Sequence, residues 1–123
     1  DLFPADQAAM TLLIYCQLTD RRFADAQKQL ETGLKLFPED QALAYYGVYA
    51  FAAGGKTLRN ISQASKLSNK LGGESRIVAD GYVLAGQGKF TEAVASEERL
   101  KEPFNLGHYS KSMLPQIIKY DAL

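Results

Sequence analysis

The chain has 123 residues, of which 46% are hydrophobic and 23% are charged, a composition typical of a single globular domain over residues 1–123. Lysine plus arginine and aspartate plus glutamate are equal at 14 each, so no global field attracts nucleic acid or an anionic membrane surface. No apolar run approaches the roughly 20 residues that a membrane-spanning helix needs. These totals disfavour nucleic-acid binding and membrane insertion.

A nearly identical heptapeptide occurs twice in the first third of the chain. LFPADQA occupies residues 2–8 and LFPEDQA residues 36–42, so six of seven letters recur at an offset of 34 residues. A recurrence at a period of about 20–50 residues indicates stacked supersecondary units. The first copy has two interpretations, the end of a further unit upstream in a longer chain or a simple leader to the first helix.

The first unit covers residues 7–40 and is predicted to form two helices. Apolar residues recur at three- and four-residue steps from Gln7 to Thr19, which predicts one helix, and the pattern resumes after the turn TDRR. Pro38 is expected to end the second helix, because residues before a proline avoid helical angles, and Asp40 is expected to cap the next. The apolar stripes contain Met10, Leu13, Ile14 and Leu18, then Phe23, Ala26, Leu30, Leu34 and Phe37.

Two further units follow, over residues 41–73 and 74–103. In the second, one helical stripe ends at the glycine pair 54–55 and its partner at the glycine pair 72–73, a C-cap signal. In the third, the turn GQGK separates two stripes, and the last ends before Pro103. The stripes contain Leu43, Tyr46, Gly47, Ala50, Phe51, Leu58, Ile61, Ala64, Leu67 and Leu71, then Ile77, Gly81, Leu84, Ala85, Phe90, Ala93, Val94 and Leu100.

The second helices of the three units align with one another. Successive spacings are 38 and 29 residues, so the repeat is irregular and its connections differ in length. Repetition of sequence is expected to specify repetition of stacking, because a unit with an exposed apolar face buries it against a similar neighbour. The aligned positions are Phe23, Ile61 and Phe90, and Ala26, Ala64 and Ala93.

The 34-residue offset and the segment GKFTEAV at residues 88–94 resemble the tetratricopeptide-repeat family, and the resemblance spans residues 4–103. It implies an all-α fold, a right-handed α-solenoid of three antiparallel helical hairpins. The sequence departs from the family pattern where a large aromatic residue is expected, because Met10, Ala44 and Ile77 stand there. Asp80 stands where an apolar residue would pack, so we expect it to be exposed or paired.

The tail, residues 104–123, fits no fourth repeat. Met113, Leu114, Ile117 and Ile118 suit a short helix that caps the last unit, with Pro115 in its first turn. A peptide-like strand that docks elsewhere is the alternative. The chain has no initiating methionine, so we expect it to be processed or a fragment of a longer protein.

Catalytic and metal-binding motifs are weak in this sequence. His108 is the only histidine and Cys16 the only cysteine, and Cys16, close to the apolar stripe, is expected to be a packing residue. AGGK and GQGK lack the spacing of a phosphate-binding loop and are predicted to be turns. Glu97, Glu98 and Glu102, beside basic residues, are expected on a solvated helix face. We therefore predict no enzyme activity, no metal and no cofactor.

The tyrosine residues give a clearer indication of function than the candidate catalytic and metal-binding residues do. Tyr15, Tyr49 and Tyr82 are equivalent in the aligned units, at spacings of 34 and 33 residues. The resemblance places such positions on the concave surface, and tyrosine is common at binding hot spots. One hypothesis is a peptide-binding groove, and the alternative is that the tyrosines pack between adjacent hairpins. The groove candidates are Ala8, Thr11, Tyr15, Tyr45, Tyr49, Val78 and Tyr82.

The leading interpretation is a non-enzymatic module that binds a peptide segment of a partner protein, as a scaffold or chaperone. The groove candidates include no charged residue, which favours a less polar ligand over a carboxylate clamp. A structural domain that self-associates through its ends, as in a homodimer, and a regulatory domain of a larger protein are the alternatives. A single cysteine slightly favours a cytoplasmic location, and a periplasmic one stays open if a signal peptide was removed.

Overall fold

The computed structural model describes residues 4–99, 105–106 and 110–111, and side chains from residue 7 to residue 99. The described chain is helical apart from one pair of two-residue antiparallel strands, in which Asn105 is opposite Lys111. The elements are α1 (Pro4–Thr19), α2 (Phe23–Leu36), α3 (Gln41–Ala53), α4 (Leu58–Ser68), α5 (Gly73–Gly86), α6 (Phe90–Glu97), β1 (Asn105–Leu106) and β2 (Ser110–Lys111).

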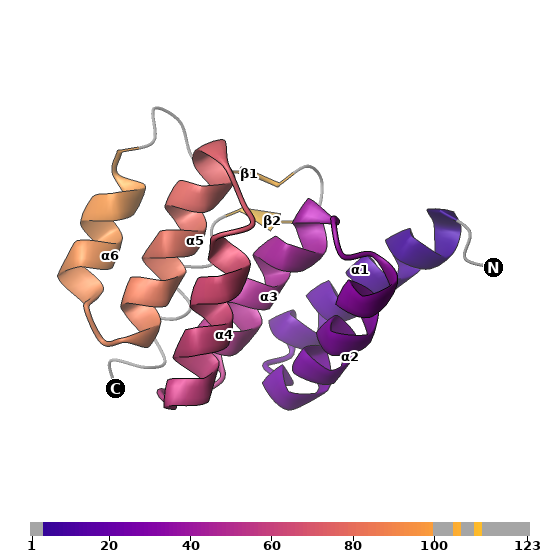
Figure 1. The fold of residues 1–123 in the computed structure, drawn as a ribbon. Helices are drawn as coiled ribbons and strands as arrows, with labels where there is room; N and C mark the ends of the chain where they lie inside the picture. The colour runs from indigo at the N-terminus through magenta and orange to yellow at the C-terminus, as the bar shows by residue number, and fades with distance from the viewer. Residues whose placement is uncertain (1–3, 100–104, 107–109, 112–123) are drawn as a thin grey trace.

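The helices pack as three pairs in chain order, α1 with α2, α3 with α4, and α5 with α6. Figure 1 shows the pairs following one another across the molecule, from indigo α1 and α2 to orange α6. The middle pair contacts both neighbours, since α3 packs against α1, α2 and α5, and α4 packs against α5. The prediction of an all-α fold is confirmed for the repeat region, and the two short strands lie beyond it.

Several predicted boundaries are confirmed by capping contacts. The Asp40 carboxylate accepts a hydrogen bond from the Leu43 backbone N–H at 3.0 Å and caps α3. The Thr57 hydroxyl accepts one from the Asn60 N–H at 3.1 Å and caps α4. The α2 helix ends at Leu36, before Pro38, as the backbone restriction of pre-proline residues requires. AGGK and GQGK fall in the turns that follow α3 and α5.

Other boundaries differ from the predictions. The α4 helix ends at Ser68, so the glycine pair 72–73 does not cap it; Gly72 instead precedes α5, which begins at Gly73. The α6 helix ends at Glu97, before Pro103, and Leu100 of the predicted stripe lies outside the described residues. At the other end of the chain α1 begins at Pro4, which suits proline because the first helical N–H has no partner within the helix. The predicted capping helix lies outside the described residues.

The repeated heptapeptide links successive pairs through its glutamine. The Gln7 side-chain amide donates to the Asp40 carboxylate at the start of α3. The Gln41 amide, at the same place in the second copy, donates to the Lys70 carbonyl oxygen at 3.3 Å, just before α5. Each copy therefore joins the beginning of one pair to the connection that leads into the next.

Candidate functional site

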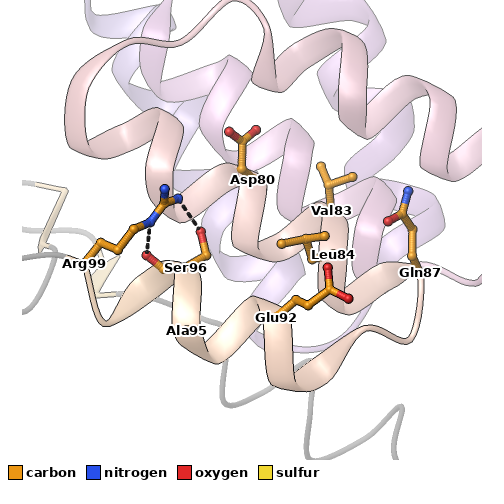
Figure 2. A pocket seen from close by; sticks show the side chains of 8 residues that line it. All are labelled: Asp80, Val83, Leu84, Gln87, Glu92, Ala95, Ser96 and Arg99. Carbon is orange, nitrogen blue, oxygen red and sulfur yellow. Dashed lines mark hydrogen bonds between the residues drawn. The ribbon is translucent and has the colours of Figure 1, made fainter.

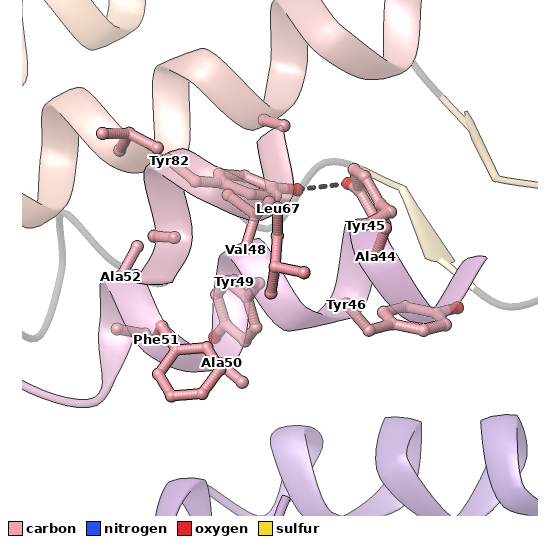
Figure 3. Packing of buried hydrophobic residues seen from close by; sticks show 14 of the residues in the cluster. Ala44, Tyr45, Tyr46, Val48, Tyr49, Ala50, Phe51, Ala52, Leu67 and Tyr82 are labelled. Atoms are coloured by element: carbon pink, nitrogen blue, oxygen red, sulfur yellow. Dashed lines mark hydrogen bonds between the residues drawn. The ribbon is translucent and has the colours of Figure 1, made fainter. Parts of the chain in front are cut away.

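A tyrosine cluster occupies the centre of the molecule, on α3 and α5 (Figure 3). Tyr45 and Tyr82 are 0% exposed and Tyr49 is 2% exposed. The Tyr82 ring centroid lies 5.6 Å from those of both Tyr45 and Tyr49, with tilted and edge-on geometry that aromatic pairs favour. The hydroxyls of Tyr45 and Tyr82 share a hydrogen bond. Burial, with the Tyr82 hydroxyl close by, raises the pKa of Tyr45 far above its ordinary value.

Tyr45, Tyr49 and Tyr82 are buried in this structure, and the groove that they were expected to line stays a prediction. Every residue of α3 from 43 to 53 is buried, and α3 packs against helices of all three pairs. Val78 is also buried at 1% exposure and Thr11 at 6%. Of the remaining groove candidates, Tyr15 is half-buried and Ala8 is exposed. The ring contacts of Tyr45 and Tyr49 on α3 with Tyr82 on α5 join the second pair to the third.

A hollow of about 620 Å³ lies between α5 and α6 (Figure 2). Two of its polar residues, Ser96 and Arg99, contact each other. Arg99 donates to the carbonyl and hydroxyl oxygens of Ser96 at 3.3 and 3.0 Å. The lining residues are Asp80, Val83, Leu84, Gln87, Glu92, Ala95, Ser96 and Arg99.

Asp80, which was expected to be exposed or paired, is both half-exposed and paired. Its carboxylate accepts a 2.6 Å hydrogen bond from the Ser68 hydroxyl of α4 and lies 3.4 Å from Arg76. Among residues 7–99, no group of three histidine, cysteine, aspartate or glutamate side chains is arranged to hold a metal ion. The Asp80 carboxylate at the α5–α6 hollow therefore links α5 to α4.

The outer face of α1 is the largest departure from the predicted packing. Leu12 is 48% exposed and Leu13 is 45% exposed, and Ala9 and Cys16 are exposed as well. Cys16 is thus a surface residue and not the packing residue that the sequence predicted. Ala9 and Cys16 each lie three or four residues from Leu12 and Leu13, so the four side chains form a continuous apolar stripe along the helix. We call these four residues, Ala9, Leu12, Leu13 and Cys16, the α1 outer face.

The residues of α3 that align with the α1 outer face are all buried. At the 34-residue offset they are Leu43, Tyr46, Gly47 and Ala50. Tyr46 lies 6.0 Å, between ring centroids, from Tyr15 of α1, and the Ala50 carbonyl accepts a hydrogen bond from Gln27 of α2 at 3.2 Å. In α3 this face is therefore the one that meets the preceding pair, whereas in α1 the same face meets solvent.

A sequence signal for the α1 outer face was present. The predicted stripe and the outer face together make α1 apolar on most of its circumference, as α3 is, and a helix apolar all round is normally buried on all sides.

Comparison with known proteins adds no assignment: no family model, no curated protein and no solved structure matches this chain. Within the described residues, no helix is both long and apolar enough to span a membrane.

Proposed function

We propose that this chain is a non-enzymatic protein-interaction module that receives a helix of a partner protein on the α1 outer face. The observation that carries the proposal is the exposure of Leu12 and Leu13, at 48% and 45%, on a helix face that is buried at the aligned positions of α3. The stripe from Ala9 to Cys16 contains no charged residue. The partner is therefore an amphipathic helix that contributes apolar side chains to the contact.

Together with this function we propose the tetratricopeptide-like architecture, in which antiparallel helical hairpins stack in a right-handed solenoid. Support comes from aligned positions that are used in the same way at both internal contacts. Phe23 of α2 packs edge-on against Tyr49 of α3 at 6.0 Å between ring centroids. Its aligned residue in α4, Ile61, lies beside Gly86 of α5.

The unique cysteine allows a direct test. A photo-activated cross-linker attached to Cys16 samples whatever lies on the α1 outer face, because Cys16 is exposed and is the only cysteine. In an extract of the source cells we expect discrete adducts with partner proteins, and mass spectrometry should map the partner side to an amphipathic helix. Leu13→Glu should reduce these adducts on the order of tenfold, as loss of an interface hot spot does.

Leu58→Glu is the matched control, since Leu58 is a leucine on α4 that is 86% exposed and receives the same substitution. It should leave the adducts unchanged. An identical adduct pattern for the Leu13 and Leu58 variants would refute the proposed docking face. Circular dichroism of both variants establishes that each retains the helical fold, which is expected because both leucines are already in contact with water.

A further inference from the structure

The opposite end of the molecule carries a second open surface, on α6. Val94 is 40% exposed, and it borders a hollow of about 390 Å³ that Phe90 and Glu98 also line. We call these three residues, Phe90, Val94 and Glu98, the α6 outer face. Phe90 packs partly against the core, with the Lys56 ammonium 5.5 Å from its ring centroid, so one side of the ring is held in place.

The α6 outer face aligns with the surface of α2 that receives the middle pair. At the offset of 67 residues its members correspond to Phe23, Gln27 and Glu31. Each of these contacts the next pair: Phe23 packs on Tyr49, Gln27 donates to the Ala50 carbonyl, and Glu31 pairs with Arg59 at 3.3 Å. In the second pair the corresponding residue is Asn69, directly after α4, and it accepts a hydrogen bond from Arg76 of the third pair at 2.9 Å.

The α1 outer face and the α6 outer face therefore correspond to the two surfaces that meet where α3 docks on α2. The α1 outer face aligns with the side of α3 that docks on α2, and the α6 outer face aligns with the side of α2 that α3 docks on. We propose that a second copy of this chain stacks head to tail, with its α1 outer face on the α6 outer face of the first. This inference rests on the proposed function and names its partner.

The positions of charged residues support the same arrangement of the two copies. Both internal contacts place an arginine of the following pair against the position that aligns with Glu98, the residue after α6, as the Glu31–Arg59 and Asn69–Arg76 contacts show. In a stacked second copy the following pair is α1 with α2. Arg21 stands two residues before Phe23, as Arg59 stands two residues before Ile61, so the stacked copy has an arginine at the aligned position.

A head-to-tail contact uses two different surfaces and does not close on itself, so it builds chains of increasing length. The test is sedimentation velocity from low micromolar to near-millimolar protein. The wild-type chain should progress from the 13.5 kDa monomer to dimers and longer species. Leu13→Glu and Val94→Glu each block one end, so each alone should be monomeric, with apparent association weakened on the order of tenfold or more.

Mixing the two variants separates head-to-tail stacking from every symmetric contact. Each blocked chain retains the end that the other lacks, so an equimolar mixture should form a dimer of twice 13.5 kDa and nothing larger. Leu58→Glu should associate like the wild type. A wild-type chain that stays monomeric, a Val94→Glu chain that associates normally, or a mixture that stays monomeric would each overturn the inference.

The Cys16 cross-linking experiment distinguishes failure of the head-to-tail stacking proposal from failure of the proposed docking function of the α1 outer face. Adducts that map to α6 of a second copy support the stacking proposal. Adducts that map only to a different protein, and that Leu13→Glu removes, preserve the α1 outer face as a docking surface and overturn its assignment to a second copy.

Discussion

Individual glycines set how closely neighbouring helices approach. A Cβ atom on Gly47 would lie 2.5 Å from the Cδ1 atom of Leu67, the end of a flexible side chain. A Cβ atom on Gly86 would lie 2.9 Å from the carbonyl oxygen and 3.2 Å from the Cα atom of Ala52. The second conflict is with backbone, which cannot rotate away, so Gly86 fixes the distance between α5 and α3.

Replacement of Gly86 by alanine should therefore destabilise the fold. We expect Gly86→Ala to lower the free energy of unfolding by about 1–3 kcal/mol, the usual range for overpacking. Gly81→Ala is the matched control on the same helix, because its added Cβ would meet nothing closer than 3.5 Å. It should raise the free energy by about 0.5–1 kcal/mol through helix propensity. Urea unfolding followed by circular dichroism measures both, and equal effects would contradict the close-approach argument.

Among the helices, α3 depends most on the residue that starts it. Asp40 caps α3 through the Leu43 N–H and also accepts a hydrogen bond from Gln7 of α1. The Asp40 carboxylate therefore caps α3 and also links the second helix pair to the first. Thr57 caps α4 through the Asn60 N–H and has no such role between pairs.

This difference gives a prediction about the two caps. Thr57→Ala should cost about 1 kcal/mol, the usual value of an N-cap. Asp40→Ala should cost more by about 0.5–1.5 kcal/mol, because a hydrogen bond between pairs is lost as well. Gln7→Ala measured alone and combined with Asp40→Ala isolates that bond in a double-mutant cycle. A coupling energy indistinguishable from zero in denaturant unfolding would show that Gln7 and Asp40 act independently.

Sequence periodicity was sufficient to predict the helices, but it was insufficient to predict which sides of each helix are buried and which are exposed. The three- and four-residue spacing predicted six helices in order, and the capping role of Asp40 followed from its place after Pro38. The tyrosines were predicted to face a groove from their 34- and 33-residue spacings and the family resemblance, and the α3 sequence, QALAYYGVYAFAA, has no charged side to distinguish solvent from neighbours. Cys16 was assigned to the core for the same reason, since α1 has apolar residues on both its buried and its exposed sides.

The order of packing determines how stability is distributed over the whole molecule. The middle pair is covered on both flanks, whereas each outer pair has one neighbouring pair. In a stack of this kind stability is close to a sum of local and nearest-neighbour contributions. The outer helices therefore open more often than the central one.

Native-state hydrogen exchange should show this gradient directly. We expect the backbone amides of α3 to exchange slowest, at a rate that tracks global unfolding, and those of α1 and α6 to exchange through smaller openings. The measurement belongs at low protein concentration, where stacking of copies would not protect the ends. Equal protection of α1 and α3 under those conditions would mean that the three pairs unfold as one cooperative unit.

The absence of charge on α3 has a consequence for synthesis. Chains leave the ribosome from the N-terminus, so α1 and α2 are available to shelter one flank of this 13-residue segment as soon as it emerges. The side of α3 that packs against α5 stays uncovered until residues 73–86 have been translated. During that interval the tyrosine-rich side of this segment lacks its neighbour, so we expect truncated chains that end before residue 73 to be prone to aggregate.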